Sequence, residues 1–400
     1  MKPWFALVAW IAALLAGQLC TPAAHGHELS GYIEGEMRFF PNAPLCDDQQ
    51  NNNASLALQP EYYHELKSGS SFTFVPFVRL DSADSRRTHV DIRELNFLYL
   101  AERWELTVGI DKVFWGVTEF HHLVDIINQT DLVEALDGEQ KLGQPMVHFS
   151  VPADWGTLDF FILPWFREMT FPGPGGRLRL ETPVDTDHPL YESPAGQSHL
   201  DFALRYNRTI GNTDFGIYHF SGTGREPGFL PAVTPAGGLV LRPFYQIIQQ
   251  TGIDLQTVAG QWLWKLEALH RSGQGPAFFA ATGGFEYTFV AVGDTAMDVG
   301  LLAEYAYDER GNRAGTFYQN DAMFGLRLTA NDAASSEVLI GAILDLENGT
   351  KLISIQGSRR IGDRVKLTID AGFFIDPDPQ DILFDLRRDD FLRLQLAVFF

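Results

Sequence analysis

Hydrophobic and polar residues alternate along most of the chain with a period of two. The C-terminal segment shows the pattern most clearly, because one of its faces carries Arg393 and Gln395 while the other is apolar. The apolar face consists of Leu392, Leu394, Leu396, Val398 and Phe400. Side chains of a β-strand point alternately to its two faces, so the pattern predicts a strand with an apolar environment on one side and water on the other.

Similar segments of about ten residues recur through the chain, which is typical of a transmembrane antiparallel barrel. We therefore predict an all-β fold, an up-and-down β-barrel of about 18 strands, with 16 as the alternative count, since bacterial barrels have an even number. The expected strands lie near 28–40, 53–66, 71–81, 89–100, 103–112, 144–152, 156–168, 198–208, 212–221, 245–259, 260–271, 277–292, 295–308, 319–330, 335–346, 350–360, 363–374 and 389–400.

The connections between these segments are alternately short and long. If the first strand runs outward, the short connections are periplasmic turns, near 67–70, 101–102, 152–155, 211 and 362. The long ones are then external loops, near 113–142, 169–197, 222–244 and 375–388. Short turns on one side and long loops on the other are the asymmetry expected of an outer-membrane barrel.

The only long apolar run, Trp4 to Ala16, follows Lys2 and predicts a secretory signal peptide at residues 1–26. Residues 27–400 then form a single barrel domain. Cleavage near Ala24 would remove Cys20 and leave Cys46 alone, so we expect no intramolecular disulfide.

The composition suits this fold. The chain contains 31 Phe, 12 Tyr, 8 Trp and 37 Gly, and its mean hydropathy is −0.08. Lipid-facing and lumen-facing residues average out in a barrel, whereas a helical membrane protein would be strongly apolar. The formal net charge of −21 argues against a nucleic-acid partner. Acidic residues gather in expected loops such as 376–390, but no EF-hand pattern occurs, so we expect neither a specific metal site nor a cofactor.

The segment 113–142 interrupts the alternating pattern. Its apolar residues are spaced more like those of a helix, namely Phe120, Leu123, Val124, Ile126, Ile127, Leu132, Val133 and Leu136. A loop this apolar needs burial, and the lumen is the space available in a barrel of this size. We predict a partly helical loop that folds inward and constricts the pore; the alternative is an external cap packed on its neighbours.

Five polar residues of this loop are candidates for the constriction. They are His121, His122, Asp125, Asn128 and Asp131. Asp125, Asn128 and Asp131 each either face the pore or serve as a cap or turn former, since Asp and Asn commonly make local hydrogen bonds. The adjacent histidines are weak evidence for a metal site, because neighbouring residues do not share a helix face.

Three runs of residues resemble those of uncharacterised porin-like proteins of Gram-negative bacteria. They are Phe114-Trp115-Gly116, the run from Leu123 to Asp131, and the run from Trp262 to Glu267. The resemblance spans most of the chain and implies an outer-membrane barrel that passes solutes of unspecified kind. It also allows a homotrimer, the common assembly of porins, without naming an interface. The terminal Phe400 resembles the signal by which the barrel assembly machinery recognises its substrates.

Strand parity places charges of both signs on the luminal face. The principal candidates are Arg79, Glu94, Asp111, Arg205, Lys265, Glu267, Lys366, Asp370 and Arg393. The same face should hold Glu105, Asp201, Glu286, Asp298, Glu304 and Arg327. Opposed charges create a transverse field that orders dipolar solutes; the alternative is that they pair across neighbouring strands. Trp262 and Trp264 should face lipid near a periplasmic turn.

No sequence motif indicates an enzyme, because the chain has no G-x-S-x-G elbow, H-E-x-x-H or phosphate loop. We expect a channel for passive diffusion of small hydrophilic solutes, held in the outer membrane against lipid and lipopolysaccharide. The alternatives are a closed or plugged barrel that acts as a structural or surface protein, and a barrel hydrolase with its nucleophile on the outer wall.

Overall fold

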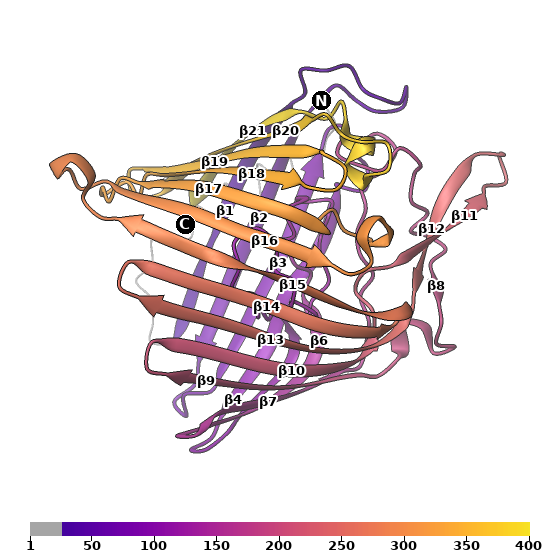
Figure 1. Ribbon diagram of the computed structural model, residues 1–400. Helices are drawn as coiled ribbons and strands as arrows, with labels where there is room; N and C mark the ends of the chain where they lie inside the picture. Colours follow the sequence, from indigo (N-terminus) through magenta and orange to yellow (C-terminus); the bar gives the residue numbers. More distant parts are fainter. Residues whose placement is uncertain (1–25) are drawn as a thin grey trace.

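The computed structural model describes residues 26–400. Within that range, eighteen strands form one antiparallel sheet. The first strand, β1 (His27–Phe39), pairs both with β2 (Asn52–Glu65) and with the last strand, β21 (Phe391–Phe399), so the sheet closes into a barrel (Figure 1). Closure pairs every strand on both sides and leaves no open edge. The predicted fold class and the predicted count of 18 strands are confirmed.

Each strand of the barrel pairs with its neighbours in chain order, as in an up-and-down barrel. The remaining strands are β3 (Ser71–Asp81), β4 (His89–Leu100), β5 (Glu105–Asp111), β6 (Gln144–Ala153), β7 (Gly156–Leu163), β9 (Asp201–Ile210), β10 (Thr213–Thr223), β13 (Ile247–Ala259), β14 (Trp262–Gly273), β15 (Gly275–Phe289), β16 (Asp298–Asp308), β17 (Asn320–Thr329), β18 (Glu337–Asp345), β19 (Lys351–Ile361) and β20 (Val365–Ile375).

Alternate residues of these strands face outward, as the period of two predicts. On β20, Ile369 and Phe373 are each 39% exposed, whereas the neighbouring Asp370 and Phe374 are buried toward the interior. On β14, Trp262 and Trp264 are exposed and stack on each other. An outward apolar face with aromatic residues near a strand end is the surface that a lipid bilayer requires of a barrel.

One patch of the outer wall is polar. His219 and Ser221 on β10 and Gln249 and Thr251 on β13 point outward and form hydrogen bonds with one another. The four residues lie toward the ends of their strands that meet the long loops. Polar groups on the lipid-facing side cost less free energy there than at the middle of a bilayer.

Short turns join the strands at one end of the barrel and long loops at the other. Gly211 and Gly260 occupy two of the short turns with φ of 61° and 65°, a left-handed conformation that glycine adopts without steric strain. At the loop end, β11 (Gly228–Val233), β12 (Leu239–Tyr245) and β8 (Leu190–Tyr191) form a separate small sheet that projects from the barrel (Figure 1). This sheet lies partly within the 222–244 loop and was not expected from the sequence.

Helical structure in residues 26–400 consists of short 3-10 turns. They are η1 (Gly196–Ser198), η2 (Val292–Asp294), η3 (Gly311–Arg313) and η4 (Ile382–Leu386). Over the same residues, the structure contains no helix of the length and apolarity needed to cross a membrane.

Two expectations need correction, and one lies outside the described residues. The segment between β5 and β6 contains no helix, so the partly helical loop was wrong; its apolar side chains are spaced to meet the barrel wall instead. The strand expected at 156–168 ends at Leu163, because Pro164 has no N–H to continue the ladder. The signal peptide predicted at 1–26 lies outside the described residues, apart from Gly26.

Candidate functional site

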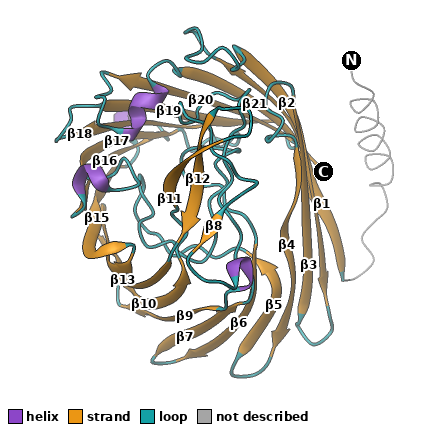
Figure 2. Ribbon diagram, turned by 90° about the vertical axis from the view of Figure 1, so that its right-hand side faces the viewer, coloured by secondary structure: helices purple, strands orange, loops and turns teal. Residues whose placement is uncertain are grey.

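The segment between β5 and β6, residues 112–143, enters the barrel and is called here the lumen loop. Figure 2, which views the barrel from its loop end, shows loops inside the ring of strands. Asn128 fixes the two ends of the lumen loop to each other. Its side chain accepts a hydrogen bond from Val113 N at 2.8 Å and donates to the carbonyl oxygens of Asp111 at 2.8 Å and Leu142 at 2.9 Å.

The apolar side chains of the lumen loop pack on the inner wall near its point of entry. Trp115, Val124, Ile126 and Ile127 are buried against residues of the neighbouring strands β6, β7, β9, β10 and β13, namely Met146, Phe161, Leu163, Ala203, Tyr218, Phe220 and Ile248. The inner wall is apolar at this place although a water-filled barrel usually has a polar interior. The lumen loop is therefore held in place by the burial of its apolar side chains against this wall.

Two glutamates, on β14 and β16, bind the tip of the lumen loop. Glu267 on β14 accepts hydrogen bonds from the backbone N–H groups of Val117, Thr118 and Val124 at 2.6 to 3.0 Å. Glu304 on β16 accepts from the N–H groups of the next residues, Glu119 and Phe120. Backbone N–H groups outside the hydrogen-bond ladder of the sheet need other acceptors. Carboxylate oxygens accept strong hydrogen bonds from them.

Arginines on β3 and β4 bind the returning half of the loop. Arg79 Nη2 lies 2.8 Å from Glu134 Oε2, and both side chains are buried. Arg93 Nη1 lies 2.7 Å from Asp131 Oδ2. Because β3 and β4 are remote from β14 and β16 in the closed sheet, these contacts show that the lumen loop spans the interior from wall to wall.

Phe120 at the tip lies against glycines of β17 and β18. A Cβ atom added to Gly341 would come within 2.9 Å of the Phe120 ring, and one added to Gly325 within 3.3 Å. The Phe120 carbonyl also accepts a hydrogen bond from Tyr318 Oη at 2.6 Å. Glycine at these two strand positions leaves the space that the ring occupies.

A second long connection also turns into the mouth of the barrel. Of the residues expected in an external loop at 169–197, Phe171, Arg177 and Leu178 are buried. The Arg177 Nε atom donates to Asp389 Oδ1 at 2.6 Å, which ties this connection to the loop before β21. The stretch therefore lies at the loop end, as expected, and some of its residues also pack inward.

Two cavities remain beside the lumen loop. The larger is about 800 Å³ and lies toward the loop end; the smaller is about 220 Å³. Both are lined by Glu119 of the lumen loop and by Leu339, Gln356 and Asp370 of β18, β19 and β20. These shared residues mark the place, called here the junction, where the two spaces adjoin on the wall formed by β18 to β20.

Charges of both signs surround this junction. Glu119 lies 2.7 Å from Arg327 Nη2 and 3.5 Å from Lys265 Nζ. Asp370 Oδ2 accepts a hydrogen bond from Arg393 Nε at 2.9 Å. Lys366 lines the smaller cavity, and no carboxylate lies within 4.0 Å of its ammonium among residues 26–400.

The other luminal candidates contact the loop or one another. Arg79 and Glu267 bind the lumen loop, as described above. Arg205 pairs with Asp254 at 2.8 Å and lies 5.0 Å from the Trp115 ring, so it packs on the loop without facing either cavity. Glu94 lies 3.6 Å from Lys112 Nζ. Asp111 accepts a hydrogen bond from Lys112 N at the start of the loop.

The five loop candidates divide into two groups. Asp125, Asn128 and Asp131 line neither cavity and hold the loop together; the Asp125 carboxylate accepts from the N–H groups of Trp115 and Gly116. His121 and His122 line the larger cavity. The first group therefore consists of caps and anchors, whereas the two histidines border a cavity.

The two histidines have different electrostatic surroundings. Burial lowers the pKa of His121 to about 4, and its ring stacks on Tyr318 with centroids 4.3 Å apart. Burial also disfavours the charged form of His122. The hydrogen bond of His122 to Glu139 Oε1 at 2.7 Å and the charge of that glutamate outweigh the effect of burial, so the pKa of His122 is raised. No group of three or more His, Cys, Asp or Glu residues suited to a metal ion occurs within residues 26–400.

Several residues of these contacts were not expected from the sequence, among them Glu119 and Glu134 of the lumen loop and Arg87 and Arg225 outside it. Arg87 Nε donates to Val133 O, and Arg225 donates to Ile127 O. Glu119 and Glu134 are polar members of the same apolar segment, and this local context was the available signal. Their partners lie on distant strands, which no local pattern identifies.

Comparisons with known proteins gave structural resemblances alone. No family model matches the chain, and no curated protein matches it. Solved structures that resemble it include variants of the porin of Rhodopseudomonas blastica. One is 12% identical with a TM-score of 0.44, covering 94% of this chain and 100% of that chain. Another is 10% identical with a TM-score of 0.45 and the same coverage. The fold is assigned from the strand pairing of this chain and not from these scores.

Proposed function

We propose that the protein is an outer-membrane channel through which small solutes diffuse passively. The observation that carries this proposal is the lumen loop, which is anchored on both walls and leaves two cavities that share Glu119, Leu339, Gln356 and Asp370 in their linings. A barrel with an outward apolar face needs a membrane, and charged residues along an inner passage favour hydrated solutes.

The same proposal includes the cellular setting. Export by the predicted leader would deliver the chain to the outer membrane, where its apolar wall contacts lipid and lipopolysaccharide. The last strand would bind the barrel assembly machinery, and a homotrimer is the assembly expected of a porin-like protein. The closed ladder and the apolar outer face support the placement in a membrane.

Planar-bilayer recordings test the channel. The refolded protein should conduct potassium chloride in discrete steps, and replacing residues 118–137 with a short Gly-Ser linker should give larger, stable steps. A control variant lacking residues 232–240, the outer part of the β11–β12 hairpin, should conduct like the unaltered protein. Absence of conductance in the refolded barrel, with steps appearing after loop replacement, would identify a plugged barrel instead.

The polar patch on the outer wall favours a second candidate function, ester hydrolysis. His219 Nε2 lies 3.0 Å from Gln249 Oε1, so Nε2 carries the proton and donates. Nδ1 is then free to accept from the Thr251 hydroxyl at 2.9 Å. A hydroxyl, an imidazole and an orienting amide are the groups that nucleophilic acyl transfer uses.

In this second function, Thr251 Oγ1 would attack an ester carbonyl while His219 takes its proton. The imidazolium would return the proton to the departing alcohol, and water would then release the acid. Purified protein in detergent should hydrolyse a p-nitrophenyl acyl ester, and Thr251→Val or His219→Ala should abolish turnover. Turnover that persists in both variants, or that is absent from the unaltered protein, excludes this function.

A further inference from the structure

The larger cavity has an apolar wall where a water-filled pore usually has a polar one. Inward-facing residues at the loop ends of four adjacent strands are Ile343 on β18, Leu352 on β19, Phe374 on β20 and Phe391 on β21. Leu352 belongs to two apolar clusters of the interior and connects them. The wall is therefore a continuous apolar strip that begins at the mouth of the barrel.

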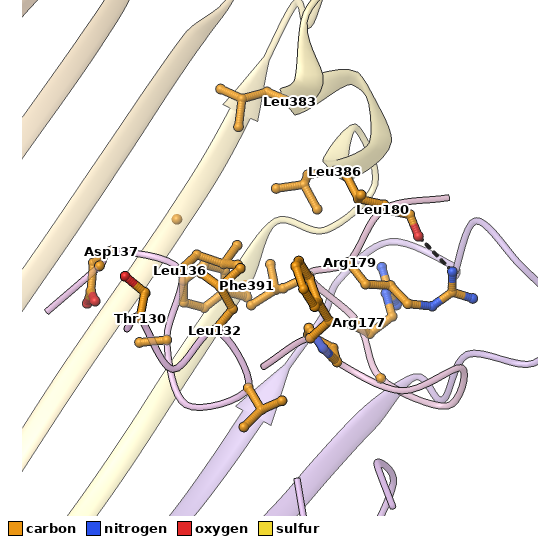
Figure 3. Close-up of a pocket in the computed structure, with 18 of the residues that line it drawn as sticks. Thr130, Leu132, Leu136, Asp137, Arg177, Arg179, Leu180, Leu383, Leu386 and Phe391 are labelled. Carbon is orange, nitrogen blue, oxygen red and sulfur yellow. Dashed lines mark hydrogen bonds between the residues drawn. The ribbon is translucent and has the colours of Figure 1, made fainter. Parts of the chain in front are cut away.

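Loop residues extend this apolar surface and pack against it in one cluster. Leu132 and Leu136 of the lumen loop and Leu383 and Leu386 of η4 all line the cavity, and Figure 3 shows the two pairs on either side of Phe391. These residues come from segments more than 240 positions apart in the chain. A solute entering from the loop end therefore meets hydrocarbon from both the strands and the loops.

The same strands become polar farther from the mouth. On β19, Ser354 and Gln356 follow Leu352 at intervals of two residues, and both line the cavity. On β21, Arg393 follows Phe391 at the same spacing. Within residues 26–400, Arg393 donates a hydrogen bond through Nε alone, to Asp370, and its Nη atoms are not among the buried groups that lack a partner. The two Nη nitrogens therefore keep some accessible surface, and Arg393 lines the cavity.

A guanidinium with a free pair of nitrogens matches a carboxylate in a two-point hydrogen bond. Beyond it, the unpaired ammonium of Lys366 lines the smaller cavity on the far side of the junction. Along the wall, the order is thus apolar strip, then Arg393, then Lys366. A sugar would lose hydration against the apolar strip without gaining hydrogen bonds, whereas an apolar body would gain from burial there.

We propose that the channel selects monocarboxylates with an apolar body, either an aromatic ring or a short alkyl chain. The apolar body slides along Leu352, Phe374 and Phe391 while the carboxylate binds Arg393 and passes to Lys366. This inference rests on the proposed channel function and narrows the small hydrophilic solutes expected from the sequence to amphipathic anions.

The test is the interruption of potassium chloride current by added solutes in planar bilayers. Benzoate should block the current for longer than glucose at equal concentration, and longer than benzyl alcohol or benzylamine, which share the ring but not the charge. Phe391→Ser should shorten the benzoate block severalfold, whereas Phe391→Leu should retain it. Arg393→Gln should remove the preference for benzoate over benzyl alcohol. Leu392→Ala, which changes the lipid-facing neighbour, should leave all blocks unchanged.

The outcomes separate this inference from the channel itself. A protein without potassium chloride conductance contradicts the proposed function. A conducting protein in which glucose blocks as long as benzoate contradicts the apolar body. A longer block by benzylamine than by benzoate contradicts the carboxylate. If Phe391→Ser fails to fold, Leu352→Ser and Leu352→Met provide the same comparison on the neighbouring part of the strip.

Discussion

Glu267 and Thr118 are 149 positions apart in the chain, yet the Glu267 carboxylate accepts hydrogen bonds from both the backbone N–H and the hydroxyl of Thr118. The N···O distance is 2.8 Å and the O···O distance 2.7 Å. The glutamate belongs to the barrel wall and the threonine to the tip of the lumen loop, so this pair fixes the position of the loop across the interior.

Glu267→Ala should release the tip of the lumen loop. Three backbone N–H groups lose their acceptor, and each buried unpaired donor costs about 1–3 kcal/mol. We expect a lower temperature for heat-induced unfolding on gels, together with larger and noisier conductance steps. Glu267→Gln, which keeps one acceptor oxygen, should give an intermediate result. Unchanged conductance in the alanine variant would show that the tip does not limit the passage.

Arg79→Met should loosen the returning half of the loop. The substitution leaves Glu134 buried without its cation, and breaking a buried pair in this way costs about 3–5 kcal/mol. The double variant Arg79→Met with Glu134→Leu should recover the part of the loss that is due to Glu134, although Glu34, 3.2 Å from Arg79 Nη2, still loses its partner. Denaturant titration of the single and double variants measures this coupling; equal losses in both would contradict it.

Asn128→Ala should lower the stability of the protein, whereas Glu119→Gln should change its ion selectivity. Asn128 makes three hydrogen bonds within the loop and lines neither cavity, so its loss should lower stability by roughly 1–3 kcal/mol without changing ion preference. Glu119 lines both cavities, so its neutralisation should shift the reversal potential in a salt gradient toward anions. A selectivity change in the Asn128 variant would place that residue in the passage.

The conductance should depend on pH through His122 and Glu139. The hydrogen bond with His122 lowers the pKa of Glu139, and the pKa of His122 is raised, so both are charged between the two values. The stabilisation from His122 is complete below its unfolded pKa and is lost as pH rises through the raised value. The stabilisation from Glu139 is present above its unfolded pKa and is lost as pH falls through the lowered value.

A titration of single-channel conductance should therefore show a transition above pH 6.5, the ordinary His pKa. His122→Asn and Glu139→Gln should each remove it, whereas His121→Asn should not, because the pKa of His121 is lowered to about 4. The effect on stability should stay below about 1 kcal/mol, since the Glu139 side chain is half exposed. A transition that survives both substitutions must come from another group.

Deletion of Phe400 should reduce assembly in cells more than stability in vitro. The residue contributes one backbone hydrogen bond, from its N–H to Gly31 O, at the seam where the barrel closes. We expect less protein in the outer-membrane fraction but refolding in detergent at nearly the normal yield. Equal losses in both measurements would assign Phe400 a role in closure instead of recognition.

The sequence by itself determined the barrel. Period-two alternation fixes which side chains share a face, and strands of this kind can satisfy their backbone in lipid only by closing into a ring. The count of strands, the outward position of Ile369 and Phe373 and the division into short turns and long loops all followed from that local rule. The inward course of the lumen loop agrees with the burial expected from its apolar composition, whereas the helical conformation expected from the spacing of its apolar residues was wrong.

Only the tertiary structure decided what the loop touches and what the passage is lined with. The partners of Glu267 and Arg79 are residues of the loop more than 50 positions away, and their pairing depends on where the chain lies after the ring has closed. The apolar strip of Leu352, Phe374 and Phe391 likewise looks like ordinary strand sequence until three strands and two loops place it around one cavity. Local patterns specify the direction in which a side chain points, whereas long-range packing specifies what it meets.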